Sequence, residues 1–343
     1  MSARAVIFGC AGPALLARER DFFAEVRPWG FILFKRNCET PDQVRRLVDG
    51  LRAAVDCADA PVLIDQEGGP VQRLAAPRWR RIPAAAAFGE LAAVDPLAAE
   101  EACRLNARLI AAELTELGID VDCLPCLDVR QADGHGVIGD RAFGCEPGLV
   151  ARLGRAVADG LLAGGALPVI KHIPGHGRAR VDSHDRLPRV DAAREELEAV
   201  DFAPFQALAD LPMAMTAHVL YAALDDERPA TTSPTVIAEC IRGRIGFDGL
   251  LMSDDISMRA LSGDVATRCR AALRAGCDVV LHCNGDFEIM QAVSGAVGPL
   301  RDAALARAER VSAWRRPAVP FDAAEAAAHL DALLAPVRAD GGA

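Results

Sequence analysis

The chain has 343 residues, of which 51% are hydrophobic and 25% are charged. This composition supplies apolar surface for a large core and excludes disorder throughout the chain. The formal net charge is -10, and basic residues occur only in short runs such as Arg80-Arg81. Nucleic-acid binding needs a concentrated basic face, so no nucleic-acid partner is expected.

The cysteines and the N-terminus indicate a reducing compartment. Eleven cysteines, an odd number, are scattered without the framework of a small disulfide-linked domain. Cys123 and Cys126 form a CxxC within an apolar run, which predicts buried structural thiols. The apolar run before Cys10 covers only residues 5–8, too short for a signal peptide, and no stretch predicts a membrane span. We expect a cytoplasmic protein with no membrane partner.

Eight short apolar runs bounded by turn residues predict β-strands. In chain order they are 5–10, 30–35, 61–66, 121–129, 167–172, 212–219, 249–255 and 277–284. Most are separated by stretches with helical periodicity, for example 41–55, 97–118, 151–164 and 193–209. Eightfold alternation of strand and helix predicts an α/β fold, a single-domain (β/α)8 TIM barrel.

Most of the predicted strands become polar at their C-terminal ends. These ends carry Lys35, Asp65-Gln66-Glu67, Asp128, Lys171-His172, His218, Asp254-Asp255, His282 and Asn284. In a closed parallel barrel such ends meet at one rim, where the following loops build the active site. The remainder is peripheral, so we expect a catalytic barrel over 1–335, ending in a helix at 322–335, and a flexible C-terminal tail over 336–343.

The segment 171–185, KHIPGHGRARVDSHD, contains three histidines after the fifth predicted strand. Its loop runs to about Pro188, longer than the usual connection in a barrel, and long loops in compact domains are commonly functional. Asp182 lies two residues before His184, where its carboxylate can fix the imidazole tautomer. This pair predicts a proton donor and acceptor near neutral pH, although the same triplet also occurs in ordinary solvated turns.

A metal site is the competing interpretation of this loop. Its histidines, with Asp182 and Asp254, offer ligands of the amidohydrolase type. Those sites begin with His-x-His after the first strand, where this chain has a Gly-Cys pair. A lysine beside His172 and an arginine close to His176 also oppose a bound cation. We therefore predict no metal and no cofactor.

Asp254 and Asp255 end the seventh predicted strand, and neighbouring strand side chains point to opposite faces. Only one of them can point at the barrel axis, and the residues alone do not decide which. A carboxylate nucleophile with a separate acid/base is the arrangement of a retaining glycosidase, with His184 in place of the usual second carboxyl. Four further rim residues suit sugar hydroxyls, namely Asp65, Arg73, Arg141 and Lys171.

Four motifs in order resemble glycoside hydrolase family 3, in particular its single-domain bacterial β-N-acetylhexosaminidases of peptidoglycan recycling. They are IDQEGGPVQRL (64–74), GDRAFG (139–144), KHIPGHGRARVDSH (171–184) and MSDDISM (252–258). The match extends from the strand at 30–37 to the strand at 278–283, almost the whole chain.

The resemblance implies an enzyme that removes terminal β-linked N-acetylglucosamine from muropeptide fragments such as N-acetylglucosamine-anhydro-N-acetylmuramic acid, with or without peptide. By motif position, Asp254 is the nucleophile, His184 the acid/base and Asp182 the residue that orients it. The same positions assign the binding of the terminal sugar to Asp65, Arg73, Arg141, Lys171 and His172, while His176 shapes the loop. The family uses a covalent intermediate and needs no cofactor or metal.

The chain departs from the family pattern in two of its motifs. Arg178-Ala179 replace an Asp and a Thr, and Pro70 replaces an Arg, which puts loop mobility and the aglycone side in doubt. A phosphorylase on the same scaffold remains open, because a His in place of a carboxylate repels phosphate less. A non-catalytic sugar-binding protein is the alternative from another class. We expect a monomer.

Overall fold

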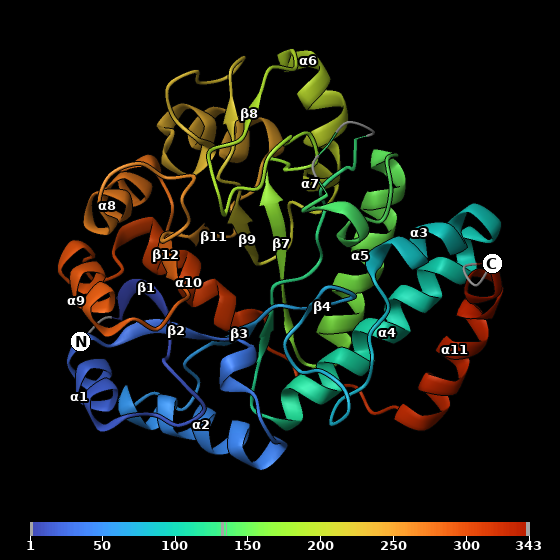
Figure 1. Cartoon of the computed structure of the whole chain (residues 1–343), viewed down its shortest axis with the longest axis horizontal. Helices are drawn as coiled ribbons and strands as arrows, with labels where there is room; N and C mark the ends of the chain where they lie inside the picture. Colours follow the sequence, from blue (N-terminus) through green and yellow to red (C-terminus); the bar gives the residue numbers. More distant parts are fainter. Residues whose placement is uncertain (1–2, 132–133, 135, 341–343) are drawn as a thin grey trace.

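The structure, a computed structural model, describes residues 3–131, 134 and 136–340. Eight parallel strands close into a barrel in the order β1-β12-β11-β9-β7-β6-β3-β2. They are β1 (Arg4–Gly9), β2 (Pro28–Leu33), β3 (Val62–Ile64), β6 (Val121–Asp122), β7 (Leu167–Ile173), β9 (Met213–Thr216), β11 (Leu250–Asp255) and β12 (Val279–His282). The predicted barrel is confirmed, and Figure 1 shows helices packed around these strands.

The helices lie outside the barrel. They are α1 (Ala17–Val26), α2 (Pro41–Ala54), α3 (Ala85–Val94), α4 (Pro96–Glu116), α5 (Pro147–Ala163), α6 (Arg194–Glu196), α7 (Ala203–Ala207), α8 (Val265–Ala275), α9 (Phe287–Ala296), α10 (Asp302–Trp314) and α11 (Ala323–Asp340). Small pairs β4 (Gln66–Gly68) with β5 (Val71–Gln72) and β8 (Arg189–Val190) with β10 (Leu220–Tyr221) lie in the loops. None of the helices in the described part of the chain has the length and apolar character that a membrane crossing requires.

Alternation along the strands separates two apolar cores. In β1, Ala5 and Ile7 belong to the core inside the barrel, while Val6 and Phe8 belong to the core between the barrel and its helices. Every second strand residue therefore faces the barrel axis. The last inward-facing residue of each strand is the one that can reach the rim.

Several predicted elements end elsewhere, and proline accounts for most of the differences. The run 121–129 is a strand only at Val121–Asp122, because Pro125 has no N–H for a ladder. The predicted helix 193–209 is divided into α6, a π-helical segment Leu197–Asp201 and α7, with Pro204 in the first turn of α7. Conversely, Pro147 begins α5 before the predicted residue 151, since an N–H is dispensable in the first turn.

The C-terminal boundary also differs from the prediction. Helix α11 continues through Pro336 to Asp340, past the predicted end of the final helix at residue 335. Leu330 and Leu334 are buried, and α11 packs against α3 and α4, which holds the helix across the proline. Residues 341–343 of the predicted tail lie outside the described residues.

Candidate active site

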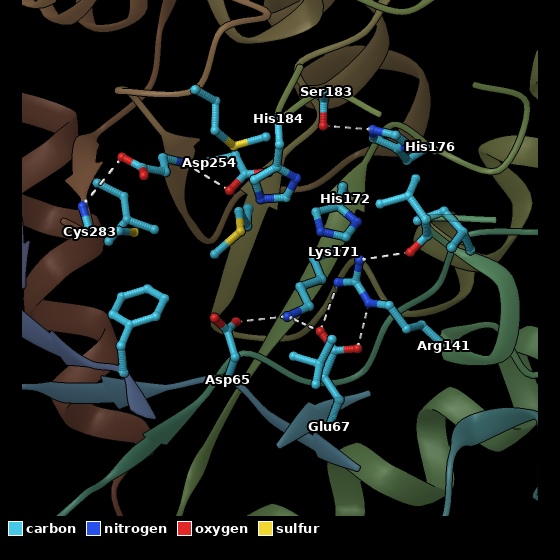
Figure 2. A pocket seen from close by; sticks show the side chains of 18 of the residues that line it. Asp65, Glu67, Arg141, Lys171, His172, His176, Ser183, His184, Asp254 and Cys283 are labelled. Atoms are coloured by element: carbon cyan, nitrogen blue, oxygen red, sulfur yellow. Dashed lines mark hydrogen bonds and ion pairs between the residues drawn. The ribbon is translucent and has the colours of Figure 1, made fainter. Parts of the chain in front are cut away.

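One pocket at the C-terminal end of the barrel brings the predicted residues together. It is lined by Asp65, Arg73, Arg141, Lys171, His172, His184 and Asp254, as Figure 2 shows for most of them. Asp182 is not among the lining residues but holds His184. The eight predicted site residues thus converge on one place, although they come from four separate segments of the chain.

Both Asp254 and Asp255 border the pocket, and their place in β11 and their hydrogen-bond partners distinguish them. Leu250 and Met252 fill the barrel interior, and Asp254 continues this alternate series to the pocket. Asp255 is held in the following loop: its Oδ1 accepts hydrogen bonds from Ser257 N at 3.1 Å, Ser257 Oγ at 2.7 Å and Cys283 N at 3.3 Å. Asp255 therefore braces the turn, and Asp254 is the carboxylate aimed at a ligand.

The surroundings of Asp254 favour its ionised form. Burial by itself would raise its pKa, but the imidazoles of His218 and His172 outweigh burial and hold the pKa below the usual value. The N–H of Asp255 also donates to Asp254 Oδ1 at 2.8 Å. His218 is fully buried at the end of β9 and lies 3.0 Å, through Nε2, from the carbonyl oxygen of Asp255. Asp254 is thus an anion within an otherwise buried wall.

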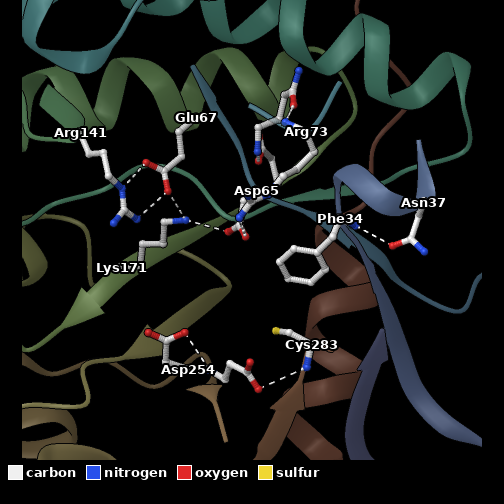
Figure 3. A network of polar contacts seen from close by, with 12 residues as sticks. Phe34, Asn37, Asp65, Glu67, Arg73, Arg141, Lys171, Asp254 and Cys283 are labelled. Carbon is white, nitrogen blue, oxygen red and sulfur yellow. Dashed lines mark hydrogen bonds and ion pairs between the residues drawn. The ribbon is translucent and has the colours of Figure 1, made fainter. Parts of the chain in front are cut away.

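A network of buried ion pairs forms the floor of the pocket (Figure 3). Lys171 Nζ lies 2.9 Å from Asp65 Oδ1 and 2.6 Å from Glu67 Oε1. Arg73 Nη2 donates to Asp65 Oδ2 at 3.0 Å. Arg141 donates to both oxygens of Glu67, at 2.8 Å each. Five charged side chains from three segments thus hold one another in fixed positions beneath the pocket.

Each charge in this floor depends on its neighbours. Burial opposes ionisation of Asp65 and Glu67, yet Lys171, with Arg73 and Arg141 respectively, keeps the pKa of both carboxyls well below the usual range. Burial likewise disfavours the ammonium of Lys171, and the two carboxylates raise its pKa above the usual value. Much of the donor capacity of Arg141 is used on Glu67, so Arg141 shapes the wall as much as it faces a ligand.

His172 is oriented from behind by Asp128. Its Nδ1 lies 2.6 Å from Asp128 Oδ2, which leaves Nε2 as the ring nitrogen available to a ligand. Asp128 also accepts from the backbone N–H of His172 at 3.3 Å and of His176 at 2.6 Å, and from Cys126 Sγ at 3.2 Å. Consecutive residues Lys171 and His172 both line the pocket where the register of β7 shifts against β9.

Within the described residues, Cys126, Asp128 and His172 are the group whose ligand atoms lie close enough together to hold a metal ion. This group is not the histidine set considered from the sequence. Burial raises the pKa of the Cys126 thiol well above its usual value, which opposes the thiolate that a metal needs. The oxygens of Asp128 already accept four hydrogen bonds. The arrangement suits a structural hydrogen-bond cluster better than a metal site.

The Asp182–His184 pair lies above the floor. His184 Nδ1 is 2.7 Å from Asp182 Oδ1, which also accepts from the backbone N–H of His184 at 2.8 Å. The side chain of His184 is 66% exposed, so its ring can reach both solvent and ligand. The side chains of His184 and Asp254 both line the pocket. The arrangement offers a carboxylate and an oriented imidazole to one ligand.

Sequence reasoning passed over several residues of the site. Glu67, Asp128, Ser183 and His218 are buried polar residues of the rim that were assigned no role. The position of Glu67 and Asp128 at strand ends was visible in the sequence, whereas their partners lie tens of residues away. Arg178, which replaces the family's Asp, pairs with Asp201 at 2.6 Å and Glu196 at 2.8 Å and so anchors the base of the loop.

A pocket lined by charged groups at the C-terminal rim of a closed barrel is where the active sites of (β/α)8 enzymes lie. The family model described as the glycosyl hydrolase family 3 N terminal domain matches residues 18–313, and the chain belongs to this family. A protein named Beta-hexosaminidase from Alkalilimnicola ehrlichii is 42% identical over 288 residues, covering 81% of this chain and 80% of that protein. One of the same name from Methylococcus capsulatus is 43% identical over 282 residues, covering 81% and 82%.

A solved structure gives the same result at the level of the fold. The structure of NagZ from Neisseria gonorrhoeae in complex with N-trifluoroacetyl-D-glucosamine superposes with a TM-score of 0.85 at 32% sequence identity. The superposition covers 98% of this chain and 97% of that one. The family resemblance noted in the four sequence motifs is therefore confirmed.

Proposed function

We propose that this protein is a retaining exo-β-N-acetylglucosaminidase that works through a covalent glycosyl-aspartate. The observation that carries the proposal is that Asp254, in β11, and the Asp182-bound His184, in the loop after β7, line the same pocket. The names of the relatives, and the N-acylated glucosamine bound by the Neisseria protein, support a hexosaminide as substrate.

In the first step, the Asp254 carboxylate attacks the anomeric carbon of the terminal sugar. The bond from that carbon to the glycosidic oxygen breaks, and protonated His184 gives its proton to the departing oxygen. In the second step, neutral His184 takes a proton from water, whose oxygen attacks the same carbon. The ester bond to Asp254 breaks, and the sugar leaves with its original β configuration.

The ion-paired floor binds the terminal sugar in this proposal. Asp65 accepts from sugar hydroxyls, and Lys171, Arg73 and Arg141 donate to oxygens of the sugar or its acyl group. His172 adds Nε2, since Nδ1 is held by Asp128. The geometry of the floor is set before the ligand arrives, which reduces the entropy lost on binding.

The proposed substrate is a cell-wall muropeptide fragment, N-acetylglucosamine linked to anhydro-N-acetylmuramic acid, with or without peptide. This choice rests on the family resemblance and on the similarity to NagZ. We propose that the protein acts in the cytoplasm as a monomer, in peptidoglycan recycling, and that its barrel needs no metal or cofactor.

The test uses the purified full chain with a chromogenic N-acetyl-β-glucosaminide and with the anhydro-disaccharide. We expect both to be cleaved, β-N-acetylglucosamine to be the first anomer seen by NMR, and a glycosyl ester to be trapped on the peptide that contains Asp254. First release of the α-anomer would contradict a retaining enzyme. Release of sugar 1-phosphate only when phosphate is added would identify the phosphorylase, and binding without cleavage would identify a sugar-binding protein. Turnover should be unchanged by chelators.

A further inference from the structure

Ser183 is buried inside an otherwise exposed turn. It is 4% exposed, whereas the side chains of its neighbours Asp182 and His184 are 26% and 66% exposed. Burial of a hydroxyl is unfavourable unless the hydroxyl forms a hydrogen bond. The middle residue of the Asp-Ser-His triplet therefore needs a partner within the protein.

Ser183 has partners on two sides. Its Oγ lies 3.2 Å from Nε2 of His176, the contact drawn in Figure 2. Its carbonyl oxygen accepts from the N–H of Ala260 at 3.2 Å, in the loop that follows Asp254. One residue thus joins the turn both to the base of its own loop and to the loop of the proposed nucleophile.

His176 is itself held in place from below. Its backbone N–H donates to Asp128 Oδ1 at 2.6 Å, and Asp128 holds His172 through the ring Nδ1. Burial, and then the charge of His172, lowers the pKa of His176 to about 4, so its ring is neutral near pH 7. Position 177 has no room for a side chain, because a Cβ on Gly177 would lie 1.9 Å from the carbonyl oxygen of Val129. The base of the loop is therefore held against the segment that follows β6.

We propose that Ser183 is a positioning residue for proton transfer, and that its hydrogen bond with His176 holds the Asp182–His184 pair over the sugar pocket. The inference rests on the proposed function and deepens it. Both ends of the contact are buried, whereas Asp182 and His184 reach into solvent, so the turn has its fixed point at Ser183. Loss of the Ser183–His176 hydrogen bond leaves the Asp182–His184 contact intact, but it lowers the fraction of time that His184 lies beside the glycosidic oxygen.

The experiment compares Ser183→Ala with the wild type on two N-acetyl-β-glucosaminides, one with a dinitrophenolate leaving group and one with an alkyl aglycone. Protonation matters chiefly for the poor leaving group, and general-acid catalysis contributes about 10²–10⁴-fold. We expect kcat/KM to fall by about 10–100-fold for the alkyl glycoside and by less than about 3-fold for the activated one. Ser183→Thr keeps the hydroxyl and should retain the wild-type ratio. Ser262→Ala, at an exposed position, is the matched control and should leave kcat/KM unchanged for both glycosides.

A second pair of variants tests the Ser183–His176 contact by changing His176. His176→Gln places an amide near the position of Nε2 and should retain the wild-type ratio, whereas His176→Leu should reproduce the ratio of Ser183→Ala. Equal losses on both substrates, or no loss on either, in Ser183→Ala and His176→Leu would overturn the inference. Thermal unfolding of each variant identifies any that fail to fold. A wild type inactive on both glycosides would instead contradict the proposed function.

Discussion

The floor and the roof of the pocket are built in different ways. The floor consists of five buried or half-buried charged side chains, in which Lys171, Asp65 and Glu67 are joined directly. The roof is a long loop in which the exposed His184 is held by Asp182 and, next to it, Ser183 by His176. A buried charge network is rigid because any displaced member leaves the others unpaired. A loop held by a few contacts can release and re-form around a ligand.

This difference assigns a task to each part. In the proposed function, the floor recognises a sugar of fixed shape, and the roof delivers a proton to leaving groups of different size. Substitutions in the floor should therefore affect stability together with binding, whereas substitutions in the roof should affect chemistry and leave the fold intact. The predictions below test this division, beginning with the residue that lies between the two parts.

Asp254→Asn should produce the largest loss of activity. The amide cannot form the glycosyl ester, and we expect kcat/KM to fall by at least about 10⁴-fold while sugar binding persists. Asp255→Asn is the matched control: an amide oxygen can still accept from Ser257 and Cys283, so the loss should be about tenfold or less. Steady-state kinetics and calorimetric binding of N-acetylglucosamine measure both. A greater loss in Asp255→Asn would show that the nucleophile is the neighbouring carboxylate.

His184→Ala should affect the roof alone. We expect a loss of about 10²–10⁴-fold on glycosides with poor leaving groups and a much smaller loss on activated ones. The melting temperature should stay close to that of the wild type, because the side chain is largely exposed. His329→Ala, an exposed histidine on α11, serves as the control. An equal loss of activity on all substrates would show that His184 is not the residue that transfers the proton.

Lys171→Met should destabilise the floor. It leaves Asp65 and Glu67 buried with one cation fewer, a defect that typically costs about 3–5 kcal/mol of unfolding free energy. The chain has one other lysine, Lys35, which is exposed. Lys35→Met should change the unfolding free energy by less than about 0.5 kcal/mol. Urea denaturation measures both, and equal stability of the two variants would contradict a floor held by charge pairing.

Asp122→Asn should change the pH dependence of stability. Asp122 is fully buried beneath the floor, and burial, only partly offset by the N–H of Gln66, raises its pKa to about 8. The folded state therefore binds this proton more tightly than the unfolded state, and the stability it provides is lost as pH rises from about 4 to about 8. The variant should lack this component, while the exposed Asp226→Asn should keep it. The free energy of unfolding of the wild type and of the variants, measured at several pH values, tests this. Parallel curves of unfolding free energy against pH for the wild type and Asp122→Asn would contradict the prediction.

The fold could be predicted from the sequence because each strand lies in a short apolar run and most of these runs end in polar residues. The residues alone did not decide between Asp254 and Asp255; the structure adds that Leu250 and Met252 face the barrel interior, on the same alternate series as Asp254. Proline positions limited the accuracy of the helix ends. Helix α5 begins at Pro147, before the predicted start at residue 151. Helix α11 continues past Pro336, where the predicted helix ended.

The hydrogen bonds and ion pairs between the site residues could not be predicted from the sequence. Glu67 and Arg141 are 74 residues apart, and nothing local indicates that they pair. Ser183 lies between the half-buried Asp182 and the exposed His184, and its partners are His176 and a backbone N–H of another loop. Such contacts follow from how the barrel brings loops together. The sequence indicated which residues reach the rim but not which of them hold one another.

The scarcity of lysine has a practical consequence for anyone attaching this protein to a support. With Lys171 enclosed in the floor, coupling through lysine amines is directed to Lys35, which directly follows the pocket residue Phe34. The support would then stand close to the entrance and hinder large glycans. Cys57 is an exposed thiol in the connection that precedes β3, at the opposite end of the barrel. Thiol coupling at Cys57 would present the open mouth to the solution.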